Sequence, residues 1–141
     1  MLSNPLIGTW RLLSCENRGS DSEVSYPFGQ DARGFIMYQQ DGYMSVAIMR
    51  AHRASFSTGD LFRGSPAEKV TAAESYFSYC GRYDFQGDKV IHHIELSLFP
   101  NWVGSDQERF VELTGDRLVL STRPMVLEGK QQTAHLVWTR V

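Results

Sequence analysis

The sequence has few of the features that mark membrane-spanning, secreted or nucleic-acid-binding proteins. No apolar run approaches the roughly 20 residues that a membrane-spanning helix needs, so we expect no membrane span. The 14 basic and 16 acidic residues give a net charge of −2, and without a basic surplus no nucleic-acid partner is expected. Residues 1–8 hold neither a basic segment nor a long apolar one, so we expect no signal peptide and a cytoplasmic location.

Cysteine is scarce: Cys15 and Cys80 are the two examples, and there is no Cys-x-x-Cys motif. Without an export signal two buried free thiols are expected, and a disulfide or redox pair is the alternative. His92 and His93 are adjacent in a predicted strand, so their side chains point apart and cannot chelate one metal together. The sequence also lacks the Gly-x-Ser-x-Gly, Walker and dinucleotide-binding motifs. We therefore expect neither a metal nor a cofactor.

What the sequence does contain is a series of short alternating segments joined by turns. Its 141 residues fit one domain over 1–141, and 42% hydrophobic and 12% aromatic residues suit a packed globule rich in strands. Asp41-Gly42 and Gly87-Asp88 each separate two strand-like runs, as hairpin turns do. Closing such a meander removes its edge strands. The sequence therefore predicts an all-β fold, an antiparallel up-and-down β-barrel of about eight strands.

One segment interrupts the strands with a helix signal. Ser65 precedes a proline and Glu68 follows three residues later, which together form a capping box. Helical spacing of apolar residues predicts one helix near 66–78, with Phe77 on the face that packs against one end of the barrel. The preceding residues 51–64 show no period, and a loop of that length is typical of a lid or a portal.

Two motifs at the ends of the chain form a matched pair. Gly8-Thr9-Trp10 opens the first strand-like segment, and Trp138-Thr139-Arg140 closes the last. The pair resembles the signature of lipocalin and wider calycin barrels, in which the Arg stacks on the Trp and closes one end of the barrel. Such stacking is worth roughly 0.5–2 kcal/mol. The resemblance predicts that Arg140 and Trp10 touch.

The segments between these ends carry the resemblance across nearly the whole chain. They are Pro27-Phe28-Gly29, Gly34–Tyr38, Asp41–Ser45, Tyr79–Tyr83, His92–Glu95, Pro100–Gly104 and His135–Trp138. Their order is similar to that of the lipocalin-like domain family of short microbial and fungal proteins. Small barrels of similar shape either bind lipophilic molecules or isomerise and cyclise natural-product intermediates, so the resemblance implies one of these two activities.

Arg109 is the sharpest candidate for ligand contact. In the segment 107–113, Glu108 and Glu112 share one face of the strand, and acidic side chains belong outside, which turns Arg109 inward. An unpaired buried charge is very costly, so Arg109 needs a partner. A bidentate pair with a ligand carboxylate supplies one, as in small lipid-binding barrels. The alternatives are an internal pair with Glu95 or a position at the rim in water.

A histidine and three tyrosines are further candidates. His92 shares a face with Ile94, Leu96 and Leu98 and is predicted to point inward, where a neutral imidazole suits general acid–base chemistry. The alternative is a hydrogen-bonded histidine of the core. Tyr38, Tyr79 and Tyr83 have inward parity and suit either a pocket wall that holds a carbonyl or enolate oxygen, or ordinary core packing.

These candidates support two leading functions. The first is binding of a small, partly hydrophobic or amphipathic molecule in the barrel, with Arg109 engaging its anionic or carbonyl end. The alternative is a cofactor-independent isomerase or cyclase with His92 as acid/base and with Arg109 and Tyr83 as oxyanion stabilisers; a barrel filled by side chains is a third. We expect a monomer or homodimer. The predicted ligand-binding wall comprises Ile36, Tyr38, Met44, Tyr79, Tyr83, His92, Ile94, Trp102, Arg109 and Val111, with Trp102 either at the cavity mouth or as a plug at the base.

Overall fold

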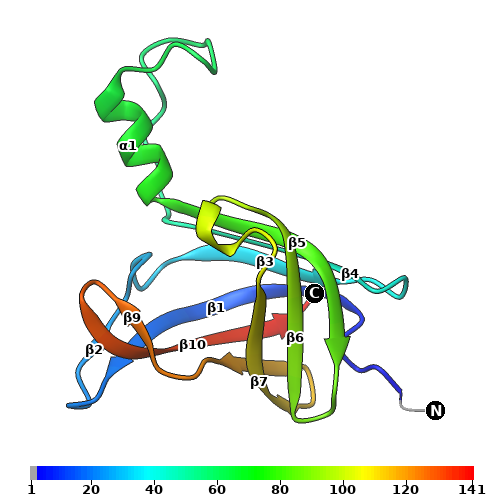
Figure 1. Cartoon of the computed structure of the whole chain (residues 1–141). Helices are drawn as coiled ribbons and strands as arrows, with labels where there is room; N and C mark the ends of the chain where they lie inside the picture. The colour runs from blue at the N-terminus through cyan, green and yellow to red at the C-terminus, as the bar shows by residue number, and fades with distance from the viewer. Residues whose placement is uncertain (1–2) are drawn as a thin grey trace.

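A computed structural model describes residues 3–141, and a single antiparallel sheet dominates them (Figure 1). Its long strands are β1 (Gly8–Gly19), β3 (Arg33–Tyr38), β4 (Tyr43–Met49), β5 (Tyr76–Phe85), β6 (Lys89–Ser97), β7 (Asp106–Thr114), β8 (Arg117–Ser121) and β10 (Lys130–Arg140). The short strands β2 (Val24–Ser25) and β9 (Met125–Leu127) flank β1 and β10. Because β10 pairs with both β8 and β1, the eight long strands close into the predicted barrel.

The closing pair of strands carries the predicted contact between the two ends of the chain. Trp10 is fully buried, and the Arg140 guanidinium lies 4.1 Å from the centre of its ring. Arg140 also donates hydrogen bonds to the carbonyl oxygens of Pro5 at 2.8 Å and Ile7 at 3.0 Å. The expected stacking of Arg140 on Trp10 is therefore confirmed, and it ties the segment before β1 to the last strand.

An irregularity in β1 changes which of its side chains face the interior. Strict alternation from Trp10 would turn Ser14 inward, but the register against β10 shifts between Leu12 and Ser14. The extra residue reverses the parity, so that Cys15 and Asn17 are buried in the second half of the strand. The inner face of β1 therefore differs from the alternation expected from its sequence.

The pairing of β5 with β6 contains a second register shift, between Cys80 and Gly81 of β5. Leu96 and Leu98, expected to share the inner face with His92, are 67% and 43% exposed, so that part of the prediction is wrong. The bulge also explains the glycine, because a Cβ at Gly81 would collide with the carbonyl oxygen of His93.

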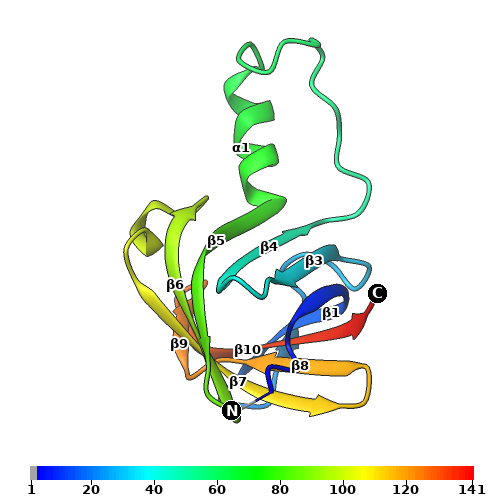
Figure 2. The same cartoon turned by 90° about the vertical axis from the view of Figure 1, so that its right-hand side faces the viewer.

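The helix α1 (Pro66–Glu74) is shorter and less packed than predicted. Its capping box of Ser65 and Glu68 is confirmed, but the helix does not extend to residue 78. Phe77 lies instead in β5 opposite Ile48, because pairing with β4 takes over from the helical pattern. No residue of α1 is buried, and Figure 2 shows the helix standing away from the barrel, so the expected packing against it is wrong. Within residues 3–141 no helix is long and apolar enough to cross a membrane.

On the outer face of the barrel, a histidine links three neighbouring strands. His93 of β6 lies between Asp106 of β7 and Asp84 of β5, with a carboxylate oxygen 2.7 Å from each ring nitrogen. Hydrogen bonds to these two carboxylates raise the pKa of His93 above its ordinary value. Both nitrogens have an acceptor as partner, so this arrangement is complete when the imidazole is protonated.

The contact between Arg140 and Trp10 can be tested by removing the guanidinium. Arg140→Met keeps an extended side chain but loses the stacking and two hydrogen bonds, and should lower the free energy of unfolding by about 2–3 kcal/mol. Arg82→Met is the control, because Arg82 lies over Tyr43 on the exposed surface. In urea unfolding the control should keep the wild-type free energy of unfolding. An equal loss of free energy in both variants would contradict a special role for Arg140.

The His93 arrangement should give stability a defined pH dependence. The folded state holds the His93 proton more tightly than the unfolded chain, so the stabilisation is complete below about pH 6.5, the ordinary pKa. It should be lost as the pH rises through the raised pKa of the folded state. Urea unfolding of the wild type should show this loss above pH 6.5, whereas His93→Gln should lack it. A parallel pH profile for the two proteins would show that the two ion pairs contribute nothing.

Candidate functional site

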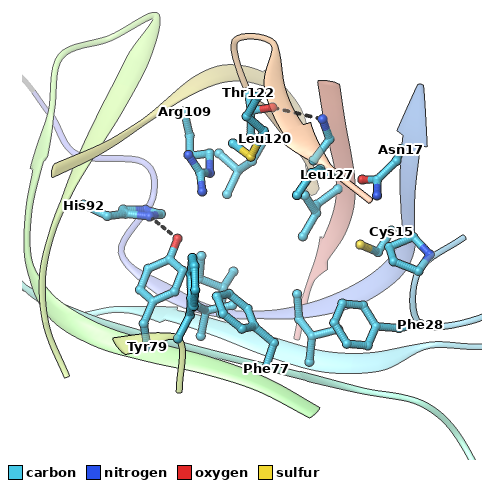
Figure 3. A pocket seen from close by; sticks show the side chains of 18 of the residues that line it. Cys15, Asn17, Phe28, Phe77, Tyr79, His92, Arg109, Leu120, Thr122 and Leu127 are labelled. Atoms are coloured by element: carbon cyan, nitrogen blue, oxygen red, sulfur yellow. Dashed lines mark hydrogen bonds between the residues drawn. The ribbon is translucent and has the colours of Figure 1, made fainter. Parts of the chain in front are cut away.

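The barrel encloses a cavity of about 380 Å³, towards the lower end of the range typical of small-molecule sites (Figure 3). Most of its wall is aliphatic or aromatic, with Ile36, Val46, Ile48, Phe28, Phe77, Leu120, Leu136 and Trp138 among the lining residues. Buried polar side chains enter at three places: Tyr79, His92 and Arg109 lie together, Asn17 lies across the cavity from them, and Thr122 lies on another part of the wall (Figure 3). Glu128 is exposed at its edge.

The structure brings half of the predicted wall together on this cavity. Ile36, Tyr79, His92, Trp102 and Arg109 line it. Five others lie elsewhere: Tyr38, Met44 and Ile94 are buried in the core, Tyr83 is buried near the chain start, and Val111 packs partly buried against the core. A side chain that alternation predicts to face inward can therefore be buried in the core of the barrel without lining the cavity.

Trp102 lies at the mouth rather than at the base. It ends the short 3₁₀ helix η1 (Pro100–Trp102), which follows β6 beside the beginning of β5, where α1 leaves the barrel. Trp10 lies instead at the other end of the barrel, where it is paired with Arg140 near the end of β10. The Trp102 ring meets Phe77 and Tyr79 edge-on, with centroids 5.5 and 5.8 Å away. This aromatic cluster forms one wall of the cavity.

His92 is held between two tyrosines. The Tyr38 hydroxyl lies 2.7 Å from Nε2 and the Tyr79 hydroxyl 2.7 Å from Nδ1. Burial, together with the charge of Arg109, lowers the pKa of His92 well below its ordinary value, so the imidazole is neutral. Burial raises the pKa of Tyr79 despite the neighbouring Arg109 guanidinium, so the phenol keeps its proton.

A neutral imidazole has one donor and one acceptor nitrogen, so the two tyrosines play different roles. Tyr38 is 1% exposed, and His92 is its hydroxyl's hydrogen-bond partner in the described structure. If Tyr38 accepted from His92, its own buried proton would have no acceptor, at a cost of about 1–3 kcal/mol. Tyr38 therefore donates to Nε2, and Nδ1–H donates to Tyr79. The Tyr79 O–H then remains available to a molecule in the cavity.

Arg109 has an inward-facing charge without a carboxylate partner. It is 7% exposed, and its Nη1 donates 2.9 Å to the carbonyl oxygen of Glu108. The guanidinium lies 5.6 Å from the ring centre of Trp102 and points into the cavity (Figure 3). No ion pair joins it to any Asp or Glu within residues 3–141, and Glu95 is exposed, so the internal-pair alternative is not observed. Its remaining N–H groups suit an anionic or carbonyl oxygen.

Sequence reasoning missed several lining residues, chief among them Asn17 and Cys15. Both face inward because of the irregularity in β1, which simple alternation does not predict. One signal was available, since the charged Glu16 and Arg18 on either side of Asn17 belong outside. Burial raises the pKa of Cys15 to about 12, so its thiol is neutral and forms part of the apolar wall. Cys15 and Cys80 are both free thiols, as expected, but Cys80 is partly exposed rather than buried.

Comparison with known proteins agrees with this architecture. A family model described as a lipocalin-like domain matches residues 7–141. A curated 4'-hydroxy-3'-methoxypropiophenone carrier protein from Aspergillus oryzae (strain ATCC 42149 / RIB 40) is 34% identical, and the match covers 70% of this chain and 96% of that protein. No solved structure gives a significant match.

The assignment of protons around His92 is directly measurable. We expect ¹⁵N NMR to show His92 as a neutral imidazole protonated at Nδ1, with no titration at the ordinary histidine pKa of about 6.5. Tyr38→Phe identifies the resonance, because it removes the partner of Nε2. A neutral imidazole protonated at Nε2 would contradict the assignment and leave Tyr38, rather than Tyr79, with the free hydroxyl proton.

Proposed function

This chain belongs to the lipocalin-like domain family, and we propose that it carries a small, partly hydrophobic molecule whose carbonyl or carboxylate end meets Arg109. One observation carries the proposal. Arg109 places a buried positive charge without a carboxylate partner in the wall of an apolar cavity of about 380 Å³. Such a charge is costly unless an oxygen atom occupies the space before it. A ligand oxygen meets this requirement, and the apolar wall receives the rest of the molecule.

Two donors converge on the proposed position of that oxygen. Arg109 offers N–H groups, and Tyr79 offers the hydroxyl proton that His92 leaves free. A carbonyl or carboxylate oxygen has two lone pairs and accepts from both, and the bond to the charged guanidinium is the stronger. Since both donors are held by neighbouring groups before the ligand arrives, little side-chain order is lost on binding.

We further propose an aryl ketone as the class of ligand. The edge-on cluster of Phe77, Tyr79 and Trp102 provides an aromatic wall beside the two donors, against which a flat ring can stack. The similar Aspergillus protein is named as the carrier of an aromatic ketone, 4'-hydroxy-3'-methoxypropiophenone. The same combination of ring and carbonyl fits the aromatic wall and the donors of this cavity.

An isomerase or cyclase is the second candidate function, and the Tyr38–His92–Tyr79 chain favours it. The three groups are joined by hydrogen bonds of 2.7 Å and suit the transfer of a proton to or from a bound ketone. In this hypothesis Tyr79, rather than the predicted Tyr83, is the tyrosine that stabilises the oxyanion. The Tyr83 hydroxyl is engaged by Gln39 and Asn4 and does not line the cavity.

Arg109→Met tests the proposed function. The change keeps much of the side-chain volume and removes the charge, so it should weaken binding of 4'-hydroxy-3'-methoxypropiophenone by about 1.5–3 kcal/mol, roughly 10- to 150-fold. Arg123→Met is the matched control, because Arg123 pairs with Glu108 on the outside of the barrel. Titration calorimetry should show wild-type affinity for the control.

Two results would count against this function. Equal affinities of the wild type and Arg109→Met for the ketone and for a fatty acid would make Arg109 a structural residue. Recovery of the ketone in a chemically altered form would instead support the isomerase or cyclase, and Arg109→Met should then lower turnover more than it weakens binding. Mass spectrometry of the ketone after incubation with the protein separates carriage from catalysis.

A further inference from the structure

A second polar group faces the cavity from the strand that closes the barrel. Asn17 lies on β1, where the backbone pairs with β10 on one side and with β2 on the other. Its side chain is 6% exposed and lines the cavity, and no hydrogen bond of its amide is observed within residues 3–141. The amide is accessible from the cavity, unlike Trp138 Nε1, which is fully enclosed without a partner among the described residues. The strand pairing on both sides fixes the backbone that carries this side chain.

An amide in this state is unusual, since buried polar side chains nearly always have a partner. The Asn17 amide faces the cavity, so a molecule in the cavity can supply the missing partner. Thr122, on the neighbouring part of the wall, shows the usual arrangement, because its hydroxyl accepts 2.9 Å from the backbone N–H of Ala134. The Asn17 amide, by contrast, points towards the cavity (Figure 3).

The surroundings of Asn17 separate it from the first polar group. Figure 3 shows it across the cavity from His92, Tyr79 and Arg109, with Cys15 and Leu127 on its own side of the cavity. These two neighbours are apolar or neutral, so their side chains do not satisfy the amide. An amide offers one acceptor and two donor hydrogens, and a hydroxyl group, which both donates and accepts, complements it.

We propose that Asn17 is a second binding point, and that the cavity selects elongated molecules with an oxygen acceptor at the Arg109 end and a hydroxyl at the Asn17 end. This inference rests on the proposed function, because it requires that a ligand occupy the cavity with its carbonyl towards Arg109. It adds the requirement for a polar group at the far end of an otherwise apolar molecule.

A pair of probes that differ in one hydroxyl tests the inference. 4'-Hydroxypropiophenone should bind the wild type about 5- to 10-fold more tightly than propiophenone, the scale of one net hydrogen bond. Asn17→Leu keeps a similar volume and should abolish this preference, whereas Arg109→Met should weaken both probes and leave the preference intact. Calorimetric titration of both probes against the three proteins gives the six affinities required.

Thermal unfolding in the absence of ligand distinguishes a binding residue from a structural one. Asn17→Leu should keep or raise the melting temperature, because it replaces an amide that has no hydrogen bond to the described residues with an apolar side chain on an apolar wall. Asn17→Ala provides the same comparison of probes should the leucine not fit. A large fall in the melting temperature of both variants would show that the amide is structural and would overturn the inference.

The inference and the proposed function fail in different ways. An unchanged preference for 4'-hydroxypropiophenone in Asn17→Leu overturns the second binding point, while Arg109-dependent binding of both probes leaves the carrier function in place. Affinities that do not depend on Arg109, or no binding of either probe to the wild type, would overturn the proposed function and the inference with it.

Discussion

The pairing of β1 with β10 is the constraint on which the rest of the structure depends. The two strands come from opposite ends of the chain, and their ladder runs from Trp10 opposite Arg140 to Gly19 opposite Gln132. Without it the sheet would have two long exposed edges and no enclosed interior. The guanidinium on the buried indole fixes one end of this ladder, and its hydrogen bonds to Pro5 and Ile7 hold the segment before the barrel against the same end.

The same strand links closure of the barrel to the chemistry of the cavity. The extra residue in β1 lies between the half that packs around Trp10 and the half that carries Cys15 and Asn17. A regular strand would turn Ser14 and Glu16 inward and would place a carboxylate in the cavity. The irregularity instead brings an amide inward and leaves Glu16 beside Arg18 outside. The cavity therefore keeps a buried cation without a competing internal anion.

Sequence reasoning predicted features that depend on local pattern and missed those that depend on strand register. Hairpin turns, the capping box and the charged face around Arg109 are local, and they were sufficient for the barrel, the helix start and the inward arginine. The end of the helix at Glu74 depends on pairing of β5 with β4, which helical spacing does not contain. The two register shifts likewise arise from pairing between distant segments, so neither Asn17 nor the exposure of Leu96 followed from alternation.

The electrostatics of the cavity follow from its single buried guanidinium. Arg109 disfavours a second positive charge nearby and, after burial, is the next cause of the lowered pKa of His92. The adjacent phenol and the Cys15 thiol stay protonated, because burial raises the pKa of each. Among the described buried side chains of the wall, Arg109 thus carries the charge near neutral pH, and the neutral groups around it act as hydrogen-bond donors or as apolar surface. An arrangement of this kind suits the proposed recognition of an oxygen atom by one charge and one hydroxyl proton, and both stay in place across the range in which histidine ordinarily titrates.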